Sequence, residues 1–171
     1  MIRLQSTTGS GNRLVLGWEE WIALPGLGLP AIKAKIDTGA KTSALHAEAI
    51  EVFGPASSPK ARFVIRPAPR RPDIVVACSA LIIDRRSVTS SNGIPEDRIV
   101  IAAEIAIAGQ AWPIEISLSD RREMNYRMLL GRQALQTGAV LIDPGASFVQ
   151  PKLGFAHYPG YKRGKSSRKS N

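Results

Sequence analysis

Short runs in which apolar and polar residues alternate fill most of this 171-residue sequence, and turn residues separate them. Ile32, Ala34 and Ile36 alternate with two lysines, and residues 114–119 follow the same pattern. A repeat of two is typical of a half-buried β-strand, whose successive side chains point to opposite faces of a sheet. Many short strands, regular turns and almost no helical pattern predict an all-β barrel or sandwich.

The chain divides into one predicted domain and two polar ends. Residues 1–13 are rich in Ser, Thr and Gly and are expected to be disordered. Residues 14–151 form the predicted domain. Residues 152–171 contain six lysines and arginines and no acidic residue, within a chain whose net charge is +9. We expect this basic segment to be a flexible tail.

The composition indicates a cytoplasmic protein that does not associate with membranes. Cys78 is the single cysteine, so an intrachain disulfide is excluded and a reducing compartment is expected. It lies in an apolar run, where we interpret it as a small buried residue rather than a nucleophile. The longest apolar segment, residues 99–108, contains Glu104 and is too short to span a bilayer. Residues 1–6 lack the apolar stretch of a signal peptide.

One tripeptide, Asp37-Thr38-Gly39, follows directly on the predicted strand that ends at Ile36. Glycine at position 39 allows a tight backbone turn, and the Thr38 hydroxyl can bond to neighbouring backbone. Asp37 would then project from a loop between two strands, where a carboxylate can act as an acid or a base. On its own, such a tripeptide more often indicates a structural Asx turn.

A second segment, residues 129–132 with the sequence Leu-Leu-Gly-Arg, gives the tripeptide its context. A helix of one or two turns is predicted over residues 132–136, with Gly138 as its end. Before it, a hairpin is predicted over residues 85–100, with Ser-Ser-Asn-Gly at its tip. In this order the features resemble the retropepsin family, in which the segment lies beside the catalytic loop and the hairpin forms a flap. The resemblance implies a closed retropepsin-like (acid protease) β-barrel with one short helix after Leu-Leu-Gly.

A closer resemblance extends over residues 14–150. The segments that carry it are residues 17–20, 34–47, 88–93, 119–121 and 128–132. They are similar to a RimB-like bacterial family of retropepsin-like proteins that is usually labelled ATP-dependent zinc protease. This resemblance implies a functional link to RimK-type ATP-grasp ligases, which attach glutamates to protein carboxyl termini.

The zinc label finds little support in the residue types. Catalytic zinc needs about three N, S or O ligands and an open position, yet the soft or borderline donors are His46, His157 and Cys78 alone. There is no His-Glu-x-x-His pattern and no phosphate-binding Gly-x-x-x-x-Gly-Lys loop. A zinc site formed by Asp37, His46 and Glu48 remains an alternative, although the spacing of these residues matches no standard zinc-binding pattern. We therefore predict no metal or cofactor, with zinc retained only through the family label.

The resemblance implies that Asp37, Thr38 and Gly39 form half of an aspartic-protease active site. Two carboxylates share one proton in such a site, and this chain has a single Asp-Thr-Gly. We therefore expect a symmetric homodimer that brings together Asp37 from each chain. The expected substrate-binding residues, beside the catalytic loop and at the flap tip, are Ala40, Lys41, Ser91, Asn92, Gly93 and Arg132.

Basic residues in or near these motifs suggest an acidic substrate. They are Lys41, Arg85, Arg86, Arg98, Arg121 and Arg132. If several of them face the cleft, they would suit Glu-rich peptides or glutamate-tailed proteins. The hypothesis is an aspartic-type peptidase in which Asp37 from two chains activates water to cleave peptide or glutamyl amide bonds.

Three other functions stay open. The first is a non-catalytic module that keeps the protease fold and binds acidic peptides, and the second is the zinc-dependent protease that the family label names. The third is contact with RNA or the ribosome through the basic residues 161–171, although a solvated tail is the favoured interpretation.

Overall fold

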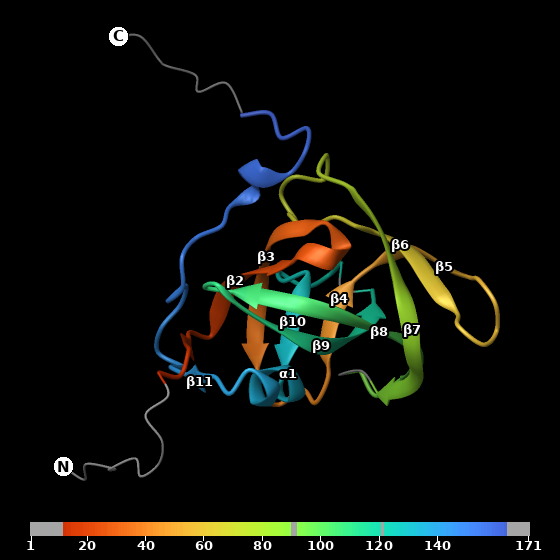
Figure 1. Cartoon of the computed structure of the whole chain (residues 1–171), viewed down its shortest axis with the longest axis horizontal. Helices are drawn as coiled ribbons and strands as arrows, with labels where there is room; N and C mark the ends of the chain where they lie inside the picture. Colours follow the sequence, from red (N-terminus) through yellow and green to blue (C-terminus); the bar gives the residue numbers. More distant parts are fainter. Residues whose placement is uncertain (1–11, 90–91, 121, 164–171) are drawn as a thin grey trace.

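The computed structural model describes residues 12–89, 92–120 and 122–163 (Figure 1). Strands dominate this part of the chain, as the alternating pattern predicted. The strands are β1 (Val15–Leu16), β2 (Glu19–Leu24), β3 (Leu29–Asp37), β4 (Ser43–His46), β5 (Glu48–Phe53), β6 (Lys60–Ile65), β7 (Val76–Thr89), β8 (Pro95–Ile107), β9 (Gln110–Ser119), β10 (Met128–Gly131) and β11 (Leu141–Ile142). The helical segments are α1 (Arg132–Thr137) and two 3-10 turns, η1 (Pro25–Leu27) and η2 (Phe155–His157).

Six strands form a ring. They pair in the order β2, β3, β10, β4, β9 and β8, and β8 pairs again with β2. That last contact is one residue pair, Ala23 with Ala106. The all-β fold is therefore confirmed, but the barrel is not strictly closed because β2 and β8 pair at a single position. The sheet continues from β8 through β7 and β6 to β5 outside the ring.

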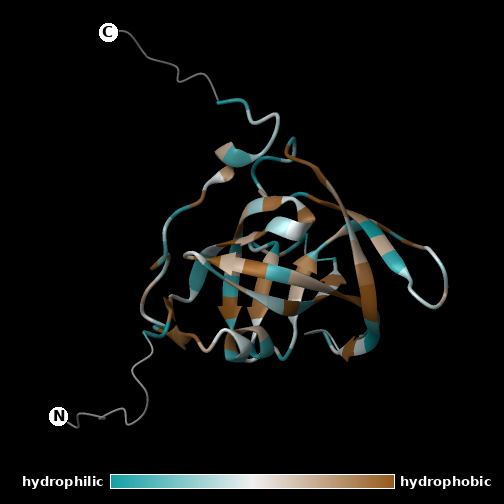
Figure 2. Ribbon diagram, viewed as in Figure 1, coloured by the Kyte–Doolittle hydropathy of each residue, from teal (hydrophilic) through white to brown (hydrophobic). Residues whose placement is uncertain are grey.

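The core lies within the ring and follows the predicted alternation. Ile32, Ala34 and Ile36 on β3 are buried, while Lys33 and Lys35 between them are exposed. Figure 2 shows the hydrophobic residues gathered on the ring strands. Full burial of an isoleucine or leucine side chain contributes about 1.5–3 kcal/mol, so this inner face supplies much of the stabilisation.

Helix α1 lies where it was predicted. Gly138 follows its last residue, as expected, but does not adopt the left-handed conformation of a typical glycine helix end. Gly138 has an ordinary φ of −75°, so it is not a left-handed helix end. A Cβ at this glycine would lie 2.4 Å from the Trp112 ring, whose Nε1 donates to the Ala134 carbonyl at 3.0 Å. The glycine therefore permits the indole to pack against the helix and to fix α1 on β9.

The packed part of the chain extends beyond the expected boundary at residue 151. Tyr158 is 3% exposed and its hydroxyl donates to the Ala31 carbonyl, while Phe155 stacks edge-on against Trp21 at 5.0 Å between ring centroids. Residues around η2 are therefore anchored on β2 and β3. These aromatic residues beyond residue 151 find apolar partners that only the fold brings near. Most of residues 1–13, predicted to be disordered, and of residues 161–171, considered for RNA binding, lies outside the described residues.

Cys78 is buried, in agreement with its interpretation as a packing residue. Its Sγ donates to the Leu27 carbonyl at 3.2 Å, and burial raises the pKa of the thiol to about 11. A thiol of this kind is protonated at neutral pH and is a poor nucleophile. Within the described residues, no helix has the length and apolar character needed to cross a membrane.

Candidate active site

Asp37 is the last residue of β3 and begins a tight, hydrogen-bonded turn. Its Oδ1 accepts a hydrogen bond from the Gly39 backbone N–H at 2.9 Å, and its carbonyl accepts one from Ala40 at 3.4 Å. A Cβ on Gly39 would lie 3.1 Å from the same carboxylate oxygen, which is closer than ordinary contact. The glycine thus lets the carboxylate sit against its own loop, in a half-buried position.

Gly131 places the Leu-Leu-Gly segment directly beside this turn. Strand β10 runs parallel to β3, and Gly131 lies opposite Asp37 in the register. A Cβ on Gly131 would lie 2.7 Å from the Thr42 carbonyl carbon, and its N–H donates to Ser43 Oγ at 3.0 Å. The chain that returns from the Asp37 turn, at Thr42 and Ser43, therefore passes so close to Gly131 that only glycine fits there.

The start of α1 holds the loop from the other side. The Arg132 backbone N–H donates to the Ala40 carbonyl at 2.7 Å, and its Nη1 donates to the Thr38 carbonyl at 2.8 Å. Thr38 thus contributes its carbonyl oxygen to the loop. Arg132 was predicted to bind substrate. In the structure, its two hydrogen bonds hold the turn that begins at Asp37.

Lys41 lies on the same loop and is exposed. Its backbone carbonyl accepts the Gln133 N–H at 3.1 Å, and its side chain is open to solvent. Among the described residues, no ion pair joins Lys41 to Asp37. Both charged groups therefore remain available to a ligand.

The predicted flap is present as the β7–β8 hairpin. Pairing extends to Thr89 opposite Pro95, and Gly93 has a φ of +79°, a conformation that favours glycine at the tip. Asn92 Oδ1 accepts the Ile94 N–H at 3.3 Å. Ser91, the other predicted tip residue, lies outside the described residues.

Arg86 connects the hairpin with the catalytic loop. Its Nη1 donates to Thr42 Oγ1 at 3.4 Å, while its other nitrogens pair with Asp84 at 2.7 Å and Glu115 at 2.8 Å. Arg98 likewise pairs with Glu96 at 3.1 Å. These two arginines, proposed from the sequence as part of an acidic-substrate cleft, are therefore largely neutralised by neighbours on the strands.

Of the donors considered for zinc, His46 and Glu48 lie together, but Asp37 does not join them. His46 N donates to the carbonyl of Arg127, the residue before β10, whereas Asp37 lies opposite the last residue of that strand. His46 Nε2 lies 3.5 Å from Glu48 Oε1, and Nδ1 lies 3.5 Å from Asp120 Oδ1. Both imidazole nitrogens thus face carboxylates. No group of three or more His, Cys, Asp or Glu side chains in the described part of the chain could hold a metal ion, so these residues do not fit a zinc site.

Burial lowers the pKa of His46, and the Arg127 charge lowers it further, against the opposing effects of Glu48 and Asp120. In the unfolded chain the imidazole has its ordinary pKa of about 6.5. Below that pH the unfolded chain binds this proton more readily than the folded protein. The free energy of unfolding is therefore expected to decrease as the pH falls from 6.5, with no contribution from this group at higher pH.

Chemical denaturation at pH values from 7.5 to 5 would measure this effect. His46→Gln should show a flatter dependence of stability on pH than the wild type. His157→Gln, at the exposed second histidine, is the matched control and should keep the wild-type slope. The range ends at pH 5 because the carboxylates of Glu48 and Asp120, whose pKa values are lowered, titrate below it. Identical slopes for wild type and His46→Gln would refute the assignment.

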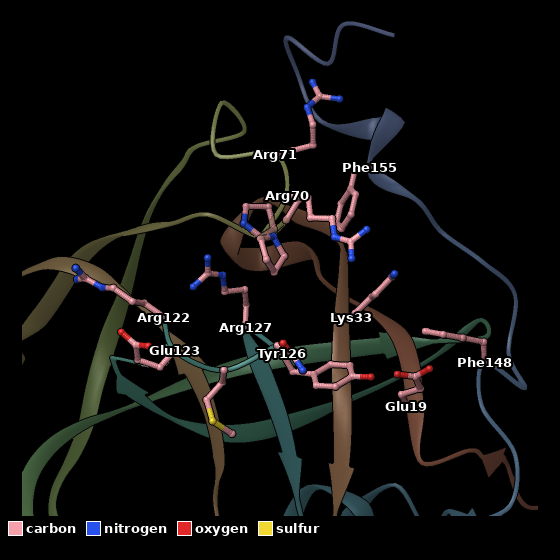
Figure 3. Close-up of a pocket in the computed structure, with 15 residues that line it drawn as sticks. Glu19, Lys33, Arg70, Arg71, Arg122, Glu123, Tyr126, Arg127, Phe148 and Phe155 are labelled. Carbon is pink, nitrogen blue, oxygen red and sulfur yellow. The ribbon is translucent and has the colours of Figure 1, made fainter. Parts of the chain in front are cut away.

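Sequence reasoning did not find a basic concavity of about 680 Å³ (Figure 3). We define the basic concavity by its cationic lining residues, which are Lys33, Arg70, Arg71, Arg122 and Arg127. The arginines of residues 70–71 and 122–127 are visible in the sequence. However, only the fold brings these two distant segments to the same face as β3.

Comparison with known proteins supports the same architecture. A family model described as "RimB-like: Retropepsin-like aspartic endopeptidase RimB" matches residues 15–153. A crystal structure of a Legionella pneumophila protein "with unknown function (DUF785)" superimposes with a TM-score of 0.65 at 26% identity. That superposition covers 81% of this chain and 98% of the Legionella chain.

Curated relatives carry a different name. A Shewanella pealeana protein is 43% identical over 145 residues, which are 85% of this chain and 31% of the relative. A Shewanella halifaxensis protein is 45% identical over 139 residues, which are 81% of this chain and 30% of the relative. Both are named "Probable alpha-L-glutamate ligase". This chain spans less than a third of the length of these relatives.

Proposed function

Because this chain belongs to the RimB-like family of retropepsin-like aspartic endopeptidases, we propose that it is an aspartic peptidase completed by a second copy of itself. The observation that carries the proposal is the position of Asp37. It ends β3, lies opposite Gly131 and is held by the Gly39 amide. Within the described residues it forms no ion pair, so its carboxylate is available for proton transfer.

The proposed chemistry requires two Asp37 carboxylates at the axis of a homodimer. Two like charges at short distance cannot both ionise, so the pair holds one shared proton. The ionised carboxylate accepts a proton from water as the water attacks the carbonyl carbon. The protonated carboxylate donates a hydrogen bond to the carbonyl oxygen, which develops negative charge. The C–N bond then breaks as the carbonyl re-forms, and the proton taken from water passes from its carboxylate to the leaving nitrogen. No metal ion takes part in this proposal.

The surrounding residues have supporting roles in the proposal. Thr38 and Gly39 shape the catalytic turn, and Arg132 holds it through the Thr38 carbonyl. Ala40 and Lys41 follow on the same loop and contact the substrate. Asn92 and Gly93, at the described part of the hairpin tip, contact the bound chain.

We further propose that the substrate is acidic and contains glutamate. The matched region forms part of longer proteins named as glutamate ligases, and a ligase that adds glutamates is a natural partner for a peptidase that removes them. Lys41 has an exposed ammonium beside the catalytic turn, which suits a carboxylate on the substrate. A functional link with a RimK-type ligase belongs to this proposal.

A purified-protein assay tests the reaction. Wild type is incubated with a peptide that ends in a run of glutamates, with and without a chelator, and the products are identified by mass spectrometry. Cleavage that survives the chelator is the expected result. Loss of all cleavage with the chelator would favour the zinc-dependent alternative. Binding of the peptide without cleavage would favour the alternative of a non-catalytic module that holds acidic peptides.

The shared site predicts that an inactive chain inhibits an active one. If wild type is mixed with nine parts of Asp37→Asn and the subunits exchange, most wild-type chains pair with an inactive partner. Activity per wild-type chain is then expected to fall by about tenfold, since only pairs of wild-type chains hold two carboxylates. Dilution with nine parts of Asp143→Asn, which is expected to be active itself, should leave the activity per total chain unchanged. Unchanged activity per wild-type chain in the Asp37→Asn mixture, relative to wild type alone, would indicate that one chain suffices.

A further inference from the structure

The basic concavity lies at a distance from the proposed catalytic residue. Lys33 precedes Asp37 by four residues on β3, which corresponds to about 13 Å along a strand. Arg127 directly precedes β10, whereas Gly131, opposite Asp37, is its last residue. The basic concavity and the Asp37 turn are therefore separated by the length of β10.

Two of its five cations are already paired. Arg71 donates to both oxygens of Asp73 at 2.9 Å and 2.8 Å, and Arg122 lies 3.3 Å from Asp120. Among the described residues, no ion pair involves Lys33, Arg70 or Arg127. Three positive charges thus face one hollow without a carboxylate at ion-pairing distance, and Lys33 acts electrostatically on Glu19 and lies over the Trp21 ring at 5.1 Å.

Arg127 is the most constrained of these three. Its Nε and Nη1 atoms are buried, and neither has a hydrogen-bond acceptor among the described residues. Figure 3 shows Arg127, Arg70 and Lys33 reaching the same space from three separate segments. Two buried guanidinium nitrogens without acceptors leave the charge of this half-buried arginine unneutralised, which favours an anion in the concavity.

Size and surroundings favour a peptide carboxylate over a nucleic-acid backbone. A volume of about 680 Å³ is that of a small-ligand pocket and accommodates a few residues of extended peptide. Glu19 and Glu123 also line it, so the carboxylates of a ligand are expected to lie at the cationic side chains and away from these two residues. Met124 and Phe155 provide apolar walls for the methylene groups of a peptide side chain. Guanidinium groups match the planar geometry of a carboxylate.

We propose that the basic concavity binds a short acidic peptide segment, whose carboxylates pair with Arg70, Arg127 and Lys33. The inference does not rest on the proposed peptidase activity. The ligand is a glutamate-rich segment of a second polypeptide, which these side chains recognise whether or not this chain cleaves it.

Fluorescence anisotropy with a labelled octaglutamate peptide tests the proposal. The measurement uses the full chain with Asp37→Asn as background, so that cleavage does not interfere and a failure of the peptidase proposal leaves the result unaffected. Arg70→Gln is expected to weaken binding by about three- to tenfold, and Arg70→Gln combined with Lys33→Gln by more than about tenfold. Both side chains are exposed, and thermal melting verifies that the variants fold.

Arg62→Gln is the matched control, because it removes an exposed arginine from β6 and should leave the affinity unchanged. Unchanged affinity in the Arg70 and Lys33 double variant would overturn the proposal. So would displacement of the peptide by inorganic phosphate at constant ionic strength, since the site would then be one for small anions. Tighter binding of a single-stranded oligonucleotide, lost in the same double variant, would assign the site to nucleic acid instead.

Discussion

Replacing Asp37 by asparagine is expected to reduce peptide hydrolysis by at least about 10²–10⁴-fold without loss of the folded structure. Asparagine has nearly the same shape, and its side-chain oxygen can still accept the Gly39 N–H that Asp37 Oδ1 accepts at 2.9 Å. It cannot take a proton from water or share one with a second carboxylate. The change therefore removes acid–base chemistry while keeping the turn. Initial rates on the glutamate-ended peptide, with a thermal melt of the same sample, measure both effects.

Asp143 provides a matched control for this substitution. Its Oδ1 accepts the Gly145 N–H at 3.0 Å, so it makes the same type of two-residue turn away from the Leu-Leu-Gly segment. Asp143→Asn is expected to retain wild-type activity and nearly wild-type stability. Full activity in Asp37→Asn, or an equal loss in both variants, would rule out a catalytic role for Asp37.

Replacing Gly131 by alanine is expected to lower the free energy of unfolding by about 1–3 kcal/mol and to impair the site at the same time. The added Cβ would lie 2.7 Å from the Thr42 carbonyl carbon and 2.9 Å from the Ser43 nitrogen. Both are backbone atoms of the catalytic loop, so a side chain cannot rotate away to relieve the contact. The loop must move, and the hydrogen bond from Gly131 N to Ser43 Oγ is strained with it.

Denaturant unfolding and peptide-cleavage rates measure the two consequences of Gly131→Ala. Gly26→Ala is the control, since a Cβ there has nothing within 4 Å. It should change neither property appreciably. The stability loss should lower the melting temperature by several degrees, at about 2–4 °C per kcal/mol for a chain of this size. Wild-type stability and activity in Gly131→Ala would show that the loop does not pass over Gly131 as described.

The local sequence determined the strands and the turn that begins at Asp37. Alternation on β3 predicted which side chains are buried, because a strand has only two faces and one must exclude water. Asp37-Thr38-Gly39 predicted a turn, because glycine allows an amide to approach the preceding carboxylate. The family resemblance predicted that Leu-Leu-Gly lies beside that turn, and the parallel pairing of β10 with β3 confirms it.

The tertiary structure alone decided which charges remain free and where the packed chain ends. Arg86 and Arg98 were expected at the site, yet carboxylates on the same or neighbouring strands pair with them. Tyr158 lies in a segment predicted to be a tail but packs against β3, because Ala31 and its neighbours provide a partner 127 residues away. The basic concavity likewise joins β3 to two loops that are far apart in sequence. The alternation of apolar and polar residues determines which face of a strand a side chain takes. The pairing of strands across the ring determines which residues lie next to it. Ion pairs depend on distances between side chains, and the sequence pattern does not contain these distances.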